Sequence, residues 1–118
     1  MAPSNQPCRG EVWLVNLNPT LGHEQSGIRP GLIVSTNTFN HGPAELVITL
    51  PITSKGKGIP FHVEVKAPEG GLTSRSFIKC EEIRSLSTER LMRKLGAVSD
   101  ATLEKVDDRI KIILELHP

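Results

Sequence analysis

The order of the predicted elements constrains the fold most: several short β-type runs come first, and the longest helical pattern comes last. The runs are rich in apolar and β-branched residues and are separated by turn-forming residues, which is typical of short strands. The expected strands cover residues 11–17, 31–35, 46–53, 61–66, 76–83 and 95–98. This order argues against alternating βαβ units. It predicts a mainly β (α+β) fold, a small and strongly bent sheet or barrel with helices at its ends.

The longest helix is expected over residues 100–116. Ser99 is a suitable N-cap, and Asp100 complements the positive end of the helix dipole. An apolar stripe at helical spacing predicts packing on the sheet or on a partner, and its members are Leu103, Val106, Ile110, Ile113 and Leu114. A short helical turn is also expected at residues 90–94.

The stretch 46–53, LVITLPIT, alternates with the period of a strand. Its even-numbered residues are all aliphatic and are expected to face the core, whereas the odd-numbered ones face away. Pro51 cannot donate a ladder hydrogen bond, so this end of the strand is expected at a sheet edge or a bulge. Thr53 then presents its hydroxyl on an open face.

The length of 118 residues argues for one domain, which we expect over residues 9–118 after a flexible tail at residues 1–8. No apolar run approaches the ~20 residues of a membrane span, and the N-terminus shows no apolar signal region. We therefore expect a cytoplasmic protein without membrane contact. Cys8 and Cys80 are then expected as free thiols.

The four histidines show no paired spacing suited to a metal, so neither a metal site nor another cofactor is expected. The net charge is +1, but residues 54–84 carry six lysines and arginines against four glutamates. That local surplus permits a phosphate-binding surface without demonstrating one.

The stretch SGIRPGLIVS, residues 26–35, contains the leading candidate for chemistry. Pro30 restricts Arg29 to extended conformations, while Gly27 and Gly31 allow tight backbone turns on either side. Arg29 is thus expected to be held stiffly where a loop meets a core strand. Its planar fork of donors matches the oxygens of a phosphate. The structural alternative is an ion pair with Glu24 that pins the loop.

Other candidates are individually less specific. Thr53 offers a hydroxyl at a strand end, His23 and Glu24 lie on the long loop before Arg29, and Lys55 and Lys57 lie in a glycine-rich turn. Lys79 and Glu81 are expected on one strand face, as an ion pair. Trp13 is interpreted either as a core residue or as a stacking surface for a base.

Three stretches together carry a family resemblance: RGEVWLVNLNPTLGHEQSGIRPGLIV, LPITSKGKGIPFHVEV and IKCEEIRSL. The first contains the E-Q-x-G-x-R-P loop, and the second contains a T-S turn. From about residue 9 to residue 116 the chain resembles the MazF/PemK (Kid-like) toxins of type II toxin–antitoxin systems. The family's acidic-Gln pair stands here as Glu81-Glu82.

The resemblance implies an SH3-like, PemK-type β-barrel with a C-terminal helix, acting as a homodimer. It also implies a sequence-specific endoribonuclease that cleaves single-stranded RNA (mRNA) without metal. Attack by the ribose 2′-hydroxyl would leave a 2′,3′-cyclic phosphate and a 5′-hydroxyl. Its implied partners are the RNA and a cognate antitoxin, which in this family is usually acidic with a segment that folds onto the toxin.

By the same resemblance, Arg29 and Thr53 are the catalytic arginine and threonine, Glu24 is the loop glutamate, and Lys79 and Glu81 are a basic–acidic pair. Arginine is a poor base because its pKa lies above ~12, so we expect Glu24 or Glu81 to accept the 2′-hydroxyl proton while Arg29 and Thr53 hold the nonbridging oxygens. The residues expected to contact RNA are His23, Asn37, Ser54, Lys55, Lys57, Lys79 and Arg84.

Two alternatives stay open on the sequence. One is a non-enzymatic, CcdB-like toxin that binds and poisons DNA gyrase. The other is an SH3-like binding module, which is weakened by an aromatic content of 3% and the lack of tyrosine, since a proline-recognition groove needs aromatic side chains.

Overall fold

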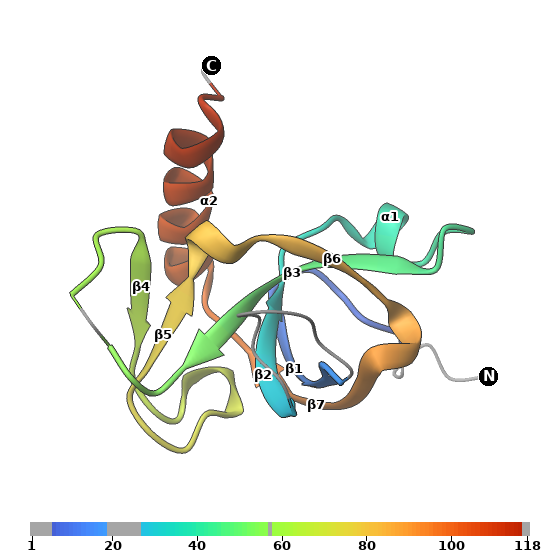
Figure 1. Ribbon diagram of the computed structural model, residues 1–118, viewed down its shortest axis with the longest axis horizontal. Coiled ribbons are helices and arrows are strands. Elements are labelled where there is room, and N and C mark those ends of the chain that lie inside the picture. Colours follow the sequence, from blue (N-terminus) through green and yellow to red (C-terminus); the bar gives the residue numbers. More distant parts are fainter. Residues whose placement is uncertain (1–5, 19–26, 57, 117–118) are drawn as a thin grey trace.

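The computed structural model describes residues 6–18, 27–56 and 58–116, which form a bent antiparallel sheet and one long helix (Figure 1). The strands are β1 (Glu11–Asn16), β2 (Ile28–Ile33), β3 (Leu46–Thr53), β4 (His62–Val65), β5 (Ser76–Lys79), β6 (Arg84–Ser87) and β7 (Leu91–Ala97). The α-helices are α1 (Asn37–Asn40) and α2 (Asp100–Leu114), and single 3₁₀ turns lie at η2 (Glu69–Gly71), η3 (Cys80–Glu82) and η4 (Thr88–Arg90). The mainly β fold with short helices and a C-terminal α-helix is therefore confirmed.

Strand β3 is the centre of the sheet, whose order is β4-β5-β3-β2-β1-β7, with β6 also paired to β3. On one side β3 pairs with β2. On the other side its residues 46–49 pair with β6, and its last two residues pair with β5. The sequence predicts a sheet edge or a bulge at this end of β3. The ladder with β2 ends at Pro51, and among the described strands Ile52 and Thr53 pair with β5 alone, so the strand end is open on its β2 side. Pro51, which lacks an N–H, lies where the partner strand changes. The described strands include no ladder between β4 and β7, so the sheet bends strongly without closing.

Two apolar clusters pack on the sheet, one on each face. The larger contains Val12, Leu32, Leu50, Ile52, Val63, Val65, Ile78 and Val106, among others. The smaller contains Trp13, Val15, Leu17, Ile33, Val47 and Leu86. Strand β2 contributes to both, as a strand buried on both faces should. The open face expected for the odd-numbered residues of β3 is only partly present, because Val47 and Thr49 are buried.

Helix α2 begins where the sequence predicts. The Ser99 hydroxyl accepts the Thr102 N–H at 3.2 Å, and Glu69 accepts hydrogen bonds from the Ser99 N–H and the Thr102 hydroxyl. These bonds lower the pKa of Glu69. The predicted stripe packs on the larger cluster except for Leu114, which is 48% exposed. Within the described residues, no helix is long and apolar enough to cross a lipid bilayer.

Other boundaries differ from expectation. The strand expected at 31–35 begins at Ile28, and the one expected at 76–83 stops at Lys79, where the chain turns through η3 into the unpredicted β6. The helical turn expected at 90–94 is wrong, because residues 91–97 form β7. Of the predicted tail at 1–8, only residues 6–8 are described; Pro7 is buried there, and the Cys8 N–H bonds Glu11.

Candidate active site

Arg29 is mounted inside a ladder, as the second residue of β2 and opposite Val15 of β1. The strand is entered through Gly27, whose φ of +84° is a conformation that side chains rarely adopt. The Gly27 N–H bonds the Asn18 side chain at 2.9 Å, and its carbonyl accepts the Leu17 N–H at 2.9 Å. The backbone of Arg29 is therefore held in the β1–β2 ladder. His23, Glu24 and Lys57 lie outside the described residues, so the alternative Arg29–Glu24 ion pair does too.

Arg29 and Thr53 line the same pocket, which we call the polar pocket and which measures about 470 Å³. The other residues along its wall are Pro30, Ile52, Ser54, Lys55, Leu72, Thr73, Ser74 and Ser76. A guanidinium, an ammonium and several hydroxyls thus converge on one open cavity. Such a set of donors suits an anion with several oxygens, such as a phosphodiester.

Thr53 is the last residue of β3, and its hydroxyl oxygen accepts the Lys55 N–H at 3.1 Å. This bond ties the following turn to the strand end and places Lys55 at the pocket. Because the hydroxyl accepts through a lone pair, it keeps its own hydrogen for donation to a ligand.

A second cavity, of about 360 Å³, shares Thr53 and Lys55 with the polar pocket and adds Ile59, His62, Lys79, Glu81 and Glu82; we call it the carboxylate pocket. Within it Lys79 Nζ lies 2.7 Å from Glu82, and Glu81 lies 2.9 Å from His62 Nε2. The expected Lys79–Glu81 pair is therefore wrong. The chain leaves strand geometry after Lys79, and the 3₁₀ turn brings Glu82 rather than Glu81 to the lysine.

His62 is a site residue that sequence reasoning missed. It lies directly opposite Lys79 in the β4–β5 ladder, and its side chain is only 4% exposed. Its Nε2–H donates to Glu81 at 2.9 Å, and its Nδ1 is buried without a hydrogen-bond partner among the described residues. An unpaired buried polar group costs about 1–3 kcal/mol. The alternation of β4 predicts that His62 points away from the core. Only the register of the β4–β5 ladder shows that it lies opposite Lys79.

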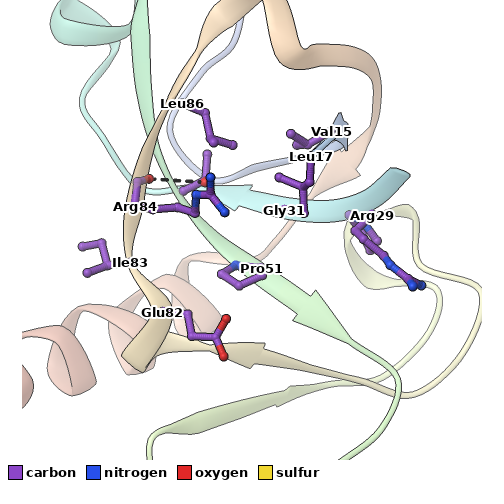
Figure 2. A pocket seen from close by; sticks show the side chains of 11 residues that line it. Val15, Leu17, Arg29, Gly31, Pro51, Glu82, Ile83, Arg84 and Leu86 are labelled. Atoms are coloured by element: carbon purple, nitrogen blue, oxygen red, sulfur yellow. Dashed lines mark hydrogen bonds between the residues drawn. The ribbon is translucent and has the colours of Figure 1, made fainter. Parts of the chain in front are cut away.

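On the other side of Arg29 lies a pocket of about 250 Å³ that is mostly apolar, the apolar pocket (Figure 2). Its aliphatic walls come from Val15, Leu17, Pro30, Gly31, Pro51, Ile83 and Leu86, and Thr49, Glu82 and Arg84 complete the lining with Arg29. The Thr49 hydroxyl donates to the Arg84 carbonyl at 3.4 Å. Arg84, expected to contact RNA, thus shares this pocket with Arg29.

Cys80 is fully buried between Lys79 and Glu81 along the chain. Burial, together with the nearby Glu81 charge, raises the pKa of the Cys80 thiol to about 11. The thiol therefore stays protonated at neutral pH and is a poor nucleophile. Among the described residues, no group of three or more histidine, cysteine or acidic side chains could hold a metal ion.

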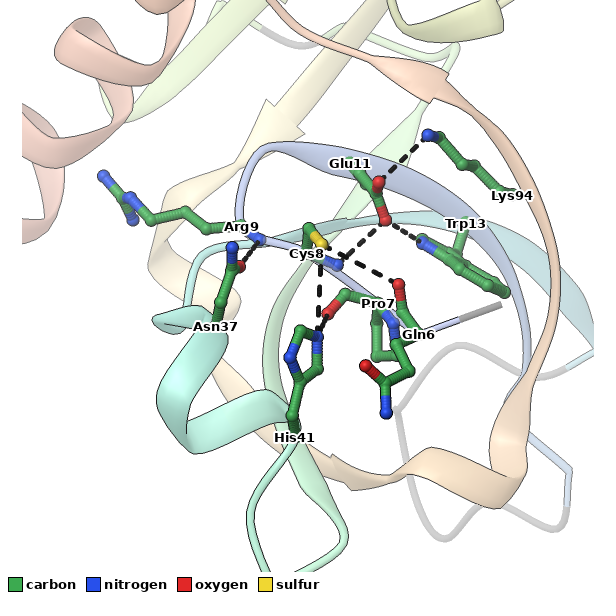
Figure 3. A network of polar contacts seen from close by, with 9 residues as sticks. All are labelled: Gln6, Pro7, Cys8, Arg9, Glu11, Trp13, Asn37, His41 and Lys94. Carbon is green, nitrogen blue, oxygen red and sulfur yellow. Dashed lines mark hydrogen bonds and ion pairs between the residues drawn. The ribbon is translucent and has the colours of Figure 1, made fainter. Parts of the chain in front are cut away.

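Asn37 lies in a separate network near the start of the described chain, where its side chain accepts the Arg9 N–H at 2.7 Å (Figure 3). At the centre of that network, Glu11 accepts the Cys8 N–H and the Trp13 indole N–H and pairs with Lys94 at 2.9 Å. Burial raises the pKa of Glu11, but these three donors outweigh it and lower the pKa overall.

Trp13 is 7% exposed and packs in the smaller cluster, which favours its interpretation as a core residue. In the described part of the chain, Asn37 does not line the pockets around Arg29 and Thr53. The structure therefore brings together Arg29, Thr53, Ser54, Lys55, Lys79, Glu81 and Arg84, and leaves Asn37 outside.

Comparisons with known proteins identify the family of the chain. The family model described as "PemK-like, MazF-like toxin of type II toxin-antitoxin system" matches residues 8–114. Endoribonuclease MazF9 of Mycobacterium tuberculosis is 41% identical, over 92% of this chain and 96% of the relative. Endoribonuclease MazF of Staphylococcus saprophyticus is 38% identical, over 92% of each chain.

A crystal structure of MazF from Deinococcus radiodurans superposes with a TM-score of 0.82 at 31% identity, over 93% of this chain and 97% of that one. A mycobacterial endoribonuclease in complex with its cognate antitoxin gives a TM-score of 0.76 at 27% identity, over 97% and 98%. Because the family model spans most of the chain and the relatives match nearly end to end, this chain belongs to the PemK-like, MazF-like toxins of type II toxin–antitoxin systems.

Proposed function

We propose that the chain is a sequence-specific, metal-independent endoribonuclease that cleaves single-stranded RNA, as the toxin of a type II toxin–antitoxin pair. The observation that carries this proposal is the polar pocket, in which Arg29 and Thr53 converge from adjacent strands. Support also comes from relatives named endoribonucleases at 33–41% identity. Action on mRNA would place the protein in the cytoplasm.

In the proposed reaction the substrate supplies its own nucleophile. The ribose 2′-oxygen attacks the phosphorus and the bond to the 5′-oxygen breaks, which leaves a 2′,3′-cyclic phosphate and a 5′-hydroxyl. The protein must stabilise the negative charge that gathers on the nonbridging oxygens. Arg29 and the Thr53 hydroxyl are donors mounted on rigid strands, so they pay little reorganisation when that charge develops.

The 2′-hydroxyl proton needs an acceptor. Glu81 lies in the carboxylate pocket, which shares Thr53 with the polar pocket, so a phosphodiester at Thr53 has a carboxylate nearby. We assign the general base to Glu81, with His62 holding one carboxylate oxygen and leaving the other for the proton. Glu24 stays the second candidate. Lys79 is paired with Glu82 and is assigned to RNA binding.

The remaining proposals concern contacts and partners. Ser54, Lys55 and Arg84 line the pockets beside Arg29, where they could contact neighbouring nucleotides. We also propose RNA contacts for Lys57, His23 and Asn37, on the basis of the sequence alone. By analogy with the mycobacterial complex, the chain is proposed to bind a cognate antitoxin. We further propose that the antitoxin covers the face that binds RNA and that the active form is a homodimer. A CcdB-like gyrase poison is not favoured, because the relatives are named endoribonucleases.

Incubation of the protein with defined single-stranded RNAs in excess EDTA, followed by mapping of both fragment ends, tests the reaction. We expect cuts at one short motif, with cyclic phosphate and 5′-hydroxyl ends. Arg29→Ala should cut at least about 100-fold more slowly, and the exposed Arg93→Ala should match the wild type, which excludes a contaminating nuclease. Intact RNA across diverse sequences would overturn the proposed function.

A further inference from the structure

Three side chains form a row across the outer face of the sheet, starting at Thr53. In the ladders Thr53 is directly opposite Phe77 of β5, and Phe77 is directly opposite Glu64 of β4. Directly opposite residues project to the same face, and neighbouring strands lie about 4.8 Å apart. The row therefore runs away from the polar pocket, with Phe77 one strand from the proposed catalytic hydroxyl.

Arg75 lies over this row and is held in two ways. Its Nε donates to Glu64 at 2.6 Å and its second terminal nitrogen at 3.4 Å, while its guanidinium carbon lies 5.2 Å from the centroid of the Phe77 ring. Even so, its side chain is 68% exposed. Exposed arginines usually keep their rotamer freedom. Here Glu64 holds the guanidinium over the Phe77 ring before any ligand arrives, while most of the side chain stays open to solvent.

The turn after Thr53 rests on the same ring. A Cβ added to Gly56 would lie 2.5 Å from two carbons of the Phe77 ring. Any residue other than glycine at position 56 would therefore require the turn or the ring to shift. Ser54, Gly56, Gly58, Arg75 and Phe77 line a cavity of about 330 Å³, the Phe77 pocket. Ser54 also lines the polar pocket, so the two cavities adjoin.

We propose that the Phe77 pocket is a nucleobase subsite. A base of the single-stranded RNA, close to the scissile phosphate, stacks on the outer face of the Arg75 guanidinium, which Phe77 supports from beneath. Bases stack on arginine planes and on aromatic rings in single-stranded RNA recognition. A phosphate is the poorer occupant, because Glu64 already neutralises Arg75. This inference rests on the proposed function and adds one binding position to it.

Stacking accepts every base, since each has a π-face, so this subsite adds affinity rather than sequence readout. The test uses RNAs that contain the mapped cleavage motif, made uncleavable by a 2′-deoxy nucleotide at the cut. One abasic nucleotide is then placed at each flanking position in turn. Dissociation constants are measured for the wild type, Arg75→Gln, Phe77→Leu and the control Phe39→Leu.

We expect one abasic position to weaken wild-type binding by about 10-fold. Arg75→Gln and Phe77→Leu should each weaken binding of the RNA with all its bases by a similar factor. In these variants, removal of that base should cause no further loss of affinity. Phe39→Leu should keep the wild-type profile. Thermal melting identifies a variant that fails to fold, and Arg75→Gln, on the surface, serves if Phe77→Leu does not.

A penalty from Arg75→Gln that is equal on every abasic RNA would overturn the stacking assignment while leaving the nuclease intact. Equal wild-type affinity for all abasic RNAs would do the same. A wild type that neither binds nor cuts RNA would instead overturn the proposed function, and this inference with it. The two failures are thus distinguishable.

Discussion

The polar pocket and the apolar pocket share Arg29 and Pro30, yet they offer opposite chemistry. Hydroxyl side chains and Lys55 line the polar pocket beside Arg29. The apolar pocket is lined mainly by aliphatic side chains, with Thr49, Glu82 and Arg84 beside them. Residues of β3 separate them: Thr49 and Pro51 line the apolar pocket, and Thr53 lines the polar one. Arg29 therefore lies on the boundary between a surface that suits a phosphate and a surface that suits apolar contact.

The change of chemistry coincides with a change of partner strand. Up to Thr49, β3 pairs with β6, and this end of its outer face is buried in the smaller cluster. From Ile52 onward β3 pairs with β5, and the same face opens to solvent at Thr53. Thr49 and Thr53, four positions apart on the same face of β3, therefore have different surroundings. The sequence of the strand alone does not show which of the two threonines takes part in catalysis.

Removal of Arg29 should have the largest effect, because this residue lines both pockets. We expect Arg29→Ala to lower the single-turnover cleavage rate by about 100- to 1000-fold, as for loss of one preorganised donor. Arg93→Ala is the matched control. A raised KM with an unchanged cleavage rate would mean that Arg29 binds RNA without taking part in catalysis. The position of Arg29 between the two pockets would then be irrelevant to the reaction.

The two threonines of β3 provide the sharpest test of the comparison. Thr53→Val keeps the β-branched shape and removes the hydroxyl, so we expect the cleavage rate to fall about 100-fold. Thr49→Val removes only a long hydrogen bond to the Arg84 carbonyl, so activity should change less than about 3-fold. Equal losses in the two variants would contradict the assignment of chemistry to the polar side.

His62 tests whether the carboxylate next to Thr53 must be held in place. His62→Leu removes the bond to Glu81, and we expect about a 10-fold drop in kcat with little change in KM, because a misoriented base accepts the proton less well. His62→Gln can still donate and should recover part of the rate. The pH–rate profile of both variants is the check; a profile identical to that of the wild type would remove Glu81 as the base.

Lys55 should give the smallest effect. A lysine that neutralises one phosphate of a single strand contributes about 0.7 to the slope of log affinity against log salt concentration. Lys55→Gln should reduce that slope by about this amount and weaken binding a few-fold, irrespective of RNA sequence. Lys66→Gln, also exposed, is the control. An unchanged slope would place Lys55 outside the RNA path.

Much of the local structure could be predicted. The alternation in 46–53 matches the bounds of β3, and Ser99 caps α2 as expected. Proline after Arg29 predicted an extended arginine, which lies in β2. The pairing of Lys79 with Glu82 could not be predicted, because η3 interrupts the strand there and changes which side chains share a face. Glu24 and His23 lie outside the described residues and stay predictions.

The sequence by itself determined the local features: which residues of β3 alternate between the two faces, where α2 begins, and that Arg29 is held extended by the proline that follows it. These features depend on residues within a few positions of one another. Only the tertiary structure decided that Arg29 shares a pocket with Thr53, that His62 holds Glu81, and that Phe77 lies between Thr53 and Glu64. A strand's alternation determines which side chains share a face, but the register between distant segments depends on how the whole sheet buries its two apolar clusters.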